Sequence, residues 1–286
     1  MMTVLEKDPL IATCGCEELP DAGKLPSLDT ALQRGLALVR PVTRIETLGL
    51  GEAAGRVLAR PVAAVAAMPP FDNSGMDGYA IRLSDLVGEG PWNLPVIGRI
   101  AAGDAPHGTI AGFGAMQIFT GAMVPDAFDA VVMQEAVRRT SSGIEFVARH
   151  SPGQNIRRKG EDQGAGSEVV GPHRKLGARE IAAAAGAGVA LVAVFRKVRV
   201  ALVVTGAELR SGGMPDNGAT IPDINTPMLT ACLTAPMVDI CATLIAPDDC
   251  AQLSQTLRHL APEVDLIVTT GGVSVGEEDH VHHAVR

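Results

Sequence analysis

The sequence predicts an α/β multidomain protein: a mostly β domain and a helical linker domain, joined to an open, mainly parallel α/β domain. Three observations support this. The 286 residues exceed the usual length of one domain. Short apolar runs between Arg82 and Phe146 are separated by glycine- and proline-containing turns, as in β domains. Two β-branched runs, KVRVALVVTG and VDLIVTTGG, alternate with helical patterns and are typical of buried parallel strands.

Composition and charge restrict the functional classes. Hydrophobic residues make up 47% and charged residues 20%, which is typical of a folded, water-soluble protein. The net charge of −8 argues against nucleic acid or an anionic membrane as the main partner. No signal segment begins the chain, so we expect a cytoplasmic protein. The five cysteines are an odd set without paired metal-ligand spacing: Cys14, Cys16, Cys232, Cys241 and Cys250.

The N-terminal part predicts a tail and a linker domain. Residues 1–26 show no periodicity, and we expect a flexible tail. Ser27 is a helix cap before apolar residues at helical spacing, and Pro41 stops that helix. We assign residues 27–62 and 161–196 to a discontinuous linker domain, with a second helix in HRKLGAREIAAAAGAG. The apolar stretch from Ile181 to Val194 is too short for a membrane helix and predicts a helix end leading into a strand.

Residues 63–160 form the expected mostly β domain, and its most unusual stretch is MPPFDNSGMDGYA, Met68 to Ala80. The prolines fix an extended entry, and Asp72-Asn73 and Asp77-Gly78 favour turns. A tight loop at the edge of a β unit explains most of these residues. The mixture of two aspartates and Tyr79 with apolar neighbours also suits the wall of a pocket, and the residues alone leave both interpretations open.

Residues 197–286 predict a β-α-β-α-β order, in which ligands bind beyond the carboxyl ends of the strands. TGAEL, Thr205 to Leu209, and TGGVSVGEED, Thr270 to Asp279, are the two loops expected there. Glycines in such a turn can be explained by its backbone geometry alone. A phosphate cradle is the alternative, formed by Gly271, Gly272, Ser274 and Gly276. Carboxylates beside a bound phosphate would repel it unless a divalent cation lay between them. The acidic residues in the two loops are Glu208, Glu277, Glu278 and Asp279.

Three weaker signals have simpler interpretations. Thr120 in FTGA is a site hydroxyl or an ordinary residue at a strand end. The run NIRRKGED is by default a solvated surface with internal ion pairs, and an anion site is the less favoured interpretation. The histidines His280, His282 and His283 lack the helical i, i+4 spacing of a zinc site, so we expect them to be exposed.

Five motifs, taken in order, resemble the molybdopterin molybdenumtransferases, the MoeA and gephyrin E-domain family. The resemblance runs from about Ser27 to Arg286 and is carried by PPFDNSGMDGYA, FTGAMVPDAFDAVVMQE, GQNIRRKGED, KVRVALVVTGAEL and TTGGVSVGEED. It implies a molybdopterin-binding α/β domain and insertion of molybdate into adenylylated molybdopterin, with Mg²⁺-dependent release of AMP. It further implies a cytoplasmic homodimer, with the molybdopterin adenylyltransferase as another partner.

The resemblance also implies roles for particular residues. The family's active-site positions fall on Asp77, Thr120, Glu208, Asp248 and Asp279. Glu208 and Asp279 are the expected metal ligands, and the loop of Gly271, Gly272, Ser274 and Gly276 is expected to hold the molybdopterin phosphate. Asp77 of one subunit would face Glu208 and Asp279 of its partner, with Asp72, Asn73 and Tyr79 shaping the wall of the site.

The sequence departs from the family pattern at three places. TGAEL has Ala207 where the family has a polar residue, and IPDIN has an apolar residue before Asn225. Family chains continue well beyond GEED, so the resemblance predicts an α/β domain truncated at its C-terminal end, either in a fragment or in a natural product of low stability and little activity. The alternative function is therefore a catalytically incomplete molybdopterin-binding or scaffold homologue.

Overall fold

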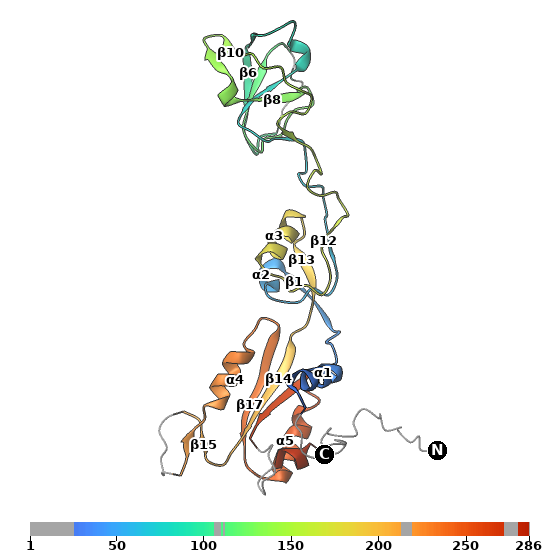
Figure 1. Ribbon diagram of the computed structural model, residues 1–286, viewed down its shortest axis with the longest axis vertical. Coiled ribbons are helices and arrows are strands. Elements are labelled where there is room, and N and C mark those ends of the chain that lie inside the picture. Colours follow the sequence, from blue (N-terminus) through green and yellow to red (C-terminus); the bar gives the residue numbers. More distant parts are fainter. Residues whose placement is uncertain (1–25, 106–109, 111, 213–218, 272–279, 286) are drawn as a thin grey trace, which may run out of the picture. The chain divides into compact units, whose positions relative to one another are not determined.

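The computed structural model of the chain describes residues 26–105, 110, 112–212, 219–271 and 280–285 (Figure 1). The chain divides into two compact units, one of which ends at Val42 while the other begins at Thr43. The first unit contains helix α1 (Leu28–Leu38). The Ser27 hydroxyl accepts a hydrogen bond from the Thr30 amide at 3.3 Å, so the predicted cap and helix are confirmed. Nearly all of the expected tail, residues 1–25, lies outside the described residues.

The linker elements of the second unit share one apolar core. Strand β1 (Ile45–Gly49) pairs antiparallel with β13 (Leu191–Phe195), and β2 (Val62–Ala63) pairs antiparallel with β12 (Glu168–Val170). Helices α2 (Leu50–Ala53) and α3 (Ala178–Gly186) complete the group. The buried side chains include Leu58, Leu176, Val192 and Val194. The stretch from Ile181 to Val194 divides between the end of α3 and β13, as predicted.

Two sheets form the β domain. The first has the order β6-β7-β4-β8, and the second has the order β5-β10-β9. Their strands are β4 (Gly78–Ile81), β5 (Trp92–Leu94), β6 (Val96–Ile100), β7 (Ala115–Ile118), β8 (Ala130–Met133), β9 (Arg138–Thr140) and β10 (Gly143–Phe146). Short 3₁₀ turns η1 (Leu83–Asp85) and η2 (Gln134–Ala136) follow β4 and β8. The mostly β domain, predicted from short apolar runs separated by glycine- and proline-containing turns, is therefore confirmed.

Strand β4 separates two apolar clusters, because alternate side chains of a strand point to opposite faces. Tyr79 and Ile81 pack with Trp92 in one cluster, and Ala80 packs with Ile118 in the other. The expectation that the MPPFDNSGMDGYA motif lies at the edge of a β unit is wrong for its last residues. β4 lies between β7 and β8, because its side chains are apolar enough to be buried on both faces.

The chain enters and leaves the β domain along paired segments. Strand β3 (Asn73–Ser74) pairs antiparallel with β11 (Ile156–Arg157), and a bridge joins Met68 to Gln163. Outside these pairs along the sequence, β2 pairs with β12 of the linker elements. Together these pairs make a two-stranded ribbon, which we call the connecting ribbon. Its two strands can be followed in Figure 1 between β12 and the sheets of the β domain.

The C-terminal elements form the α/β domain, and their β-α-β-α-β order confirms the prediction. Strand β14 (Val198–Thr205) pairs in parallel with β17 (Val238–Ala246) on one side and β18 (Leu266–Thr270) on the other. Helices α4 (Asn225–Leu233) and α5 (Cys250–Leu260) lie between the strands in sequence. Helix α6 (His280–Ala284) contacts α5, and a short parallel pair joins β15 (Leu209–Arg210) to β16 (Ile221–Pro222).

An ion pair fixes the amino end of β14. Asp265 accepts hydrogen bonds from both terminal nitrogens of Arg196, at 2.5 and 2.7 Å, and from the Arg199 amide at 2.8 Å. These contacts, with the Arg196 guanidinium first, lower the pKa of Asp265 to about 2. The segment before β18 is thereby held against the start of β14.

We expect Gly78→Ala to destabilise the β domain strongly. A Cβ atom at Gly78 would lie 2.0 Å from the carbonyl oxygen of Val132, and a backbone atom of a paired strand cannot move aside without breaking the sheet. We expect a loss of about 3 kcal/mol in the free energy of unfolding, measured by urea denaturation. Gly75→Ala is the matched control, because its Cβ would meet Asn155 at 3.4 Å, an ordinary contact. Equal stability of the two variants would contradict the prediction.

Candidate active site

The predicted site residues fall into two groups on separate domains. Asp77 and Thr120 belong to the β domain, whereas Glu208, Asp248 and Gly271 belong to the α/β domain. The remaining predicted residues lie outside the described part of the chain: Gly272, Ser274, Gly276 and Asp279. Each group is considered by itself.

The β-domain group is a carboxylate held by one threonine. Asp77 directly precedes β4, and Thr120 follows the end of β7, which is the neighbouring strand. Oδ1 of Asp77 accepts hydrogen bonds from the Thr120 amide at 2.7 Å and from the Thr120 hydroxyl at 2.8 Å. These two bonds, the amide first, lower the pKa of Asp77 below its ordinary value. The carboxylate is therefore ionised at neutral pH, and both donors are directed at the same oxygen.

The other aspartate of the motif, Asp72, has a different environment. Its carboxylate accepts a hydrogen bond from the Lys159 amide at 2.8 Å and forms an ion pair with Arg158. The Lys159 amide and then the Arg158 guanidinium lower the pKa of Asp72. Arg157 pairs with Asp162 in the same segment, so the internal ion pairing expected of NIRRKGED is confirmed. Asp72 therefore ties this segment to the MPPFDNSGMDGYA motif.

Tyr79, near the end of the motif, lies in the core of the β domain. Its side chain is 2% exposed, and its hydroxyl accepts a hydrogen bond from Nε of Arg139 at 2.8 Å. Asn73 is also buried, and its backbone pairs with β11. That Asn73 and Tyr79, together with Asp72, shape the wall of the site therefore stays a prediction, and the structure adds that Asn73 and Tyr79 are buried.

The α/β-domain group lies at one edge of the parallel sheet. Glu208 follows β14, Asp248 follows β17, and Gly271 follows β18. Because the strands are parallel, their carboxyl ends meet at the same edge, where α/β domains bind ligands. Oδ2 of Asp248 accepts a hydrogen bond from the Ala207 amide at 2.8 Å, which fixes the backbone beside Glu208. That bond uses the backbone of Ala207 and does not require a polar side chain.

The glycines at this edge permit close contacts. Gly271 has φ = 81°, and a Cβ there would lie 2.5 Å from the Thr205 hydroxyl oxygen. That hydroxyl donates to the Thr270 carbonyl at 3.0 Å and so joins the ends of β14 and β18. Gly206 has φ = 143°, and its Cβ would lie 2.8 Å from Oε2 of Glu208. Glycine at these positions is thus explained by geometry, whether or not the loop holds phosphate.

Of the two expected Mg²⁺ ligands, the described part of the chain contains Glu208. Glu208 is exposed and offers carboxylate oxygens, which Mg²⁺ prefers. Among the described residues, no group of three or more His, Cys, Asp or Glu side chains is arranged to hold a metal ion. The second expected ligand, Asp279, lies outside them.

One site-building residue was missed from the sequence. Oδ1 of Asp223 accepts hydrogen bonds from the amides of Asn225 and Thr226, both at 3.0 Å, and so caps the first turn of α4. The signal was present, because an aspartate just before a helical pattern is a common cap. In IPDIN it links β16 to α4, next to the loop that carries Glu208.

The described histidines and cysteines are not part of a metal site. His283 is exposed as expected, whereas His280 is only half-buried, at the start of α6. The described cysteines, Cys232, Cys241 and Cys250, are free thiols; Cys14 and Cys16 lie in the part not described. No helix of the described residues is long and apolar enough to span a membrane.

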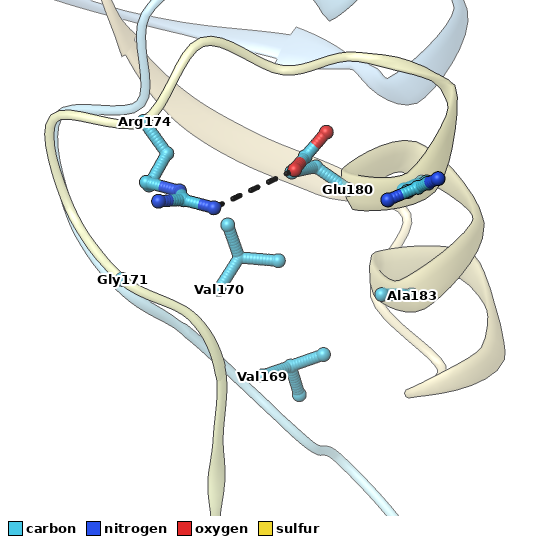
Figure 2. A pocket seen from close by; sticks show the side chains of 7 residues that line it. Val169, Val170, Gly171, Arg174, Glu180 and Ala183 are labelled. Atoms are coloured by element: carbon cyan, nitrogen blue, oxygen red, sulfur yellow. Dashed lines mark ion pairs between the residues drawn. The ribbon is translucent and has the colours of Figure 1, made fainter.

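A cavity of about 370 Å³ lies among the linker elements, as Figure 2 shows. Val169, Val170 and Ala183 form its apolar side, and Arg174 approaches Glu180 at 4.0 Å. Glu180 also accepts a hydrogen bond from the Gly177 amide at 2.9 Å and thereby caps α3. The charged groups here have a structural role in the start of α3, so this cavity is not our candidate for the active site.

The fold and the site define a class: proteins in which a β domain carrying an ionised carboxylate is combined with a ligand-binding parallel α/β domain. Residues 26–188 match the family model of the MoeA N-terminal region (domain I and II), and residues 201–286 match that of a probable molybdopterin binding domain. The chain belongs to the MoeA family, and the resemblance found in its motifs is confirmed.

Individual relatives agree with this assignment. The chain is 36% identical to a molybdopterin molybdenumtransferase of Haemophilus influenzae over 88% of its own length and 62% of the relative. It is 39% identical to molybdopterin molybdenumtransferase 2 of Mycobacterium tuberculosis, over 88% of its own length and 63% of that relative. The crystal structure of a MoeA protein from Pyrococcus horikoshii matches with a TM-score of 0.77 at 30% identity, covering 87% of this chain and 67% of that one. The chain thus spans less than two thirds of these curated relatives.

We expect Thr120→Val to raise the pKa of Asp77 towards its ordinary value. The substitution removes the hydroxyl donor and keeps the shape of the side chain, while the amide donor remains. Thr120→Ser is the control, because it keeps a hydroxyl. The carboxyl resonance of Asp77, followed by NMR during an acid titration, measures this pKa directly. An unchanged pKa in Thr120→Val would show that the hydroxyl does not stabilise the carboxylate.

Proposed function

We propose that this protein acts in molybdenum cofactor biosynthesis, where it inserts molybdate into adenylylated molybdopterin and releases AMP with the help of Mg²⁺. The main support is the edge of the parallel sheet, where the ends of β14, β17 and β18 gather Glu208, Asp248 and Gly271 within the domain that matches the molybdopterin-binding family. The relatives named molybdopterin molybdenumtransferase support the same activity.

The roles of the α/β-domain residues follow from their position. Backbone N–H groups of the loop that begins at Gly271, with Gly272, Ser274 and Gly276, would bind the molybdopterin phosphate. Glu208 and Asp279 would hold Mg²⁺, which when bound neutralises charge on the phosphoanhydride. Asp248 acts through the Ala207 amide, so we assign it the role of positioning Glu208.

In the β domain, Asp77 supplies an ionised carboxylate. Its Oδ1 is engaged by Thr120, which leaves Oδ2 to face the substrate. Thr120 would therefore orient Asp77, and the lowered pKa keeps the carboxylate charged throughout the neutral range. The acceleration in such a site comes mainly from positioning the reacting groups.

The complete site would combine two chains. We propose a homodimer in which Asp77 of one subunit faces Glu208 and Asp279 of its partner. Its support is the division of the site residues between two domains of each chain. The molybdopterin adenylyltransferase is the proposed source of the adenylylated substrate, and the cytoplasm is the proposed location.

The alternative is a catalytically incomplete homologue that binds molybdopterin or acts as a scaffold. It is favoured by Ala207, where the family has a polar residue. Binding does not separate the two functions, because both proteins would bind molybdopterin. Release of AMP does, since only an enzyme turns its substrate over.

We expect Asp77→Asn to lower the rate of AMP release by about 100-fold, because the side chain loses its negative charge, whereas its amide oxygen can still accept from Thr120. The measurement is AMP formed from adenylylated molybdopterin in the presence of Mg²⁺ and molybdate. Asp126→Asn is the control, since it removes an exposed carboxylate elsewhere in the β domain. An unchanged rate in Asp77→Asn would refute its role, and binding without any AMP release by the unaltered protein would favour the scaffold alternative.

A mixing experiment tests whether two chains share the site. We expect Asp77→Asn and Glu208→Gln to be inactive alone but to recover part of the activity when they are mixed and allowed to exchange subunits. In a mixed dimer, one of the two sites would receive Asp77 and Glu208 from unaltered positions. No recovery despite demonstrated subunit exchange would mean that each site is formed within one chain.

A further inference from the structure

A second cavity lies in the β domain and is lined by residues of both of its sheets, from β4, β6 and β7 of one and from β9 and β10 of the other. Its volume is about 340 Å³. The polar side chains around it are those of Tyr79, Gln117, Arg139, Thr140, Ser141 and Ser142. None of the residues around it is a carboxylate. Apart from Tyr79, which was expected to shape the wall beside Asp77, none of these residues has a role in the function proposed above.

Arg139 faces this cavity because of its place on β9. β9 is at one end of the sheet β5-β10-β9, and its residues alternate between the two faces. Arg139 lies opposite Ile144, which is 1% exposed, so it is on the same face of the sheet as this core residue, although Arg139 itself is exposed to solvent. Arg138 lies opposite Glu145 on the other face and forms an ion pair with it at 2.6 Å. The two arginines thus differ in environment although they are adjacent.

The buried tyrosine holds the guanidinium in place. Nε of Arg139 donates to the Tyr79 hydroxyl at 2.8 Å, and Tyr79 pairs with Gln117 in the adjacent strand. Within the described part of the chain, the terminal nitrogens Nη1 and Nη2 of Arg139 have no hydrogen-bond or ion-pair partner. Because the tyrosine hydroxyl accepts from Arg139, its own proton is free to donate to a ligand.

The loop of Ser141, Ser142 and Gly143 lines the cavity and packs closely against β5 at Gly143. The Thr140 and Ser142 hydroxyls are 3.2 Å apart and hydrogen-bonded. Gly143 has φ = 150°, and a Cβ there would lie 2.1 Å from the Leu94 carbonyl oxygen. The turn therefore packs directly against β5, and its hydroxyls are held next to Arg139.

We propose that this cavity is a binding site for a small oxyanion of the phosphate or sulfate type. One positive charge without a neighbouring carboxylate attracts an anion, and Nη1 and Nη2 can donate to two of its oxygens. The Tyr79 hydroxyl, the Gln117 amide and the loop hydroxyls supply further donors. One residue of the cavity, Tyr79, belongs to β4, the strand that follows Asp77. The cavity contains none of the groups assigned to the active site.

A purely structural explanation also exists for Arg139. Charged side chains that point inward on a strand at the edge of a sheet discourage pairing with another chain. Such a charge would need no ligand, so the experiment must measure binding itself.

The test is isothermal titration calorimetry of the protein with inorganic phosphate and with sulfate. We expect saturable binding that Arg139→Gln weakens at least about tenfold, because a charge-assisted pair of hydrogen bonds is lost. Tyr79→Phe keeps the packed ring and should weaken binding about threefold. Arg138→Gln is the matched control, since it removes the same charge from the opposite face, and it should leave the affinity unchanged.

The outcomes separate the explanations. Absence of saturable binding by the unaltered protein, or equal weakening by Arg138→Gln and Arg139→Gln, would overturn the proposal. Arg139→Lys guards against a folding defect, because it keeps the charge; its affinity should fall between those of the unaltered protein and Arg139→Gln. Phenyl phosphate identifies the source of the anion: tighter binding than inorganic phosphate indicates the phosphate of a larger molecule, and weaker binding indicates a free oxyanion.

Discussion

The α/β domain depends on the hydrogen bonds that join β14 to a parallel strand on each side. With a neighbour paired on each side from Val200 to Val204, the backbone of β14 is satisfied over this stretch, so its side chains there can be apolar and buried. Leu253 and Leu257 of α5 pack with Ala201 and Val203 on one face of this strand. The parallel pairing of the strands then decides where the candidate site residues lie. Each strand ends just before one of them: β14 before Gly206–Glu208, β17 before Asp248, and β18 before Gly271.

In the β domain, too, the pairing of strands positions a site residue. Asp77 is held in place by the neighbouring strands and not by its own loop alone. Gly78 allows β4 to approach Val132 closely, and β7 brings Thr120 beside Asp77. Asp72 then binds the segment around Arg158. Two aspartates five residues apart in one motif are thus both ionised but held by different partners: Asp77 by the amide and hydroxyl of Thr120, and Asp72 by the segment around Arg158.

Much of this arrangement could be predicted from the sequence, and the exceptions have physical reasons. The helix after Ser27, the β-α-β-α-β order and the internal pairing of NIRRKGED follow from local patterns and were correct. The burial of Tyr79 and its bond to Arg139 depend on the pairing of strands far apart in sequence, which periodicity does not reveal. Asp265 likewise looks like an ordinary acidic residue until the fold places Arg196 beside it.

The connecting ribbon has a consequence for the order of folding. Ala63 of β2 and Glu168 of β12 are neighbours in the ribbon, although about 100 residues separate them along the chain. Closing so long a loop in an unstructured chain costs conformational entropy, whereas a folded β domain already brings its own two ends together through β3 and β11. The linker domain therefore assembles most readily around an insert that has folded first, so its folding rate is governed by residues that it does not itself contain.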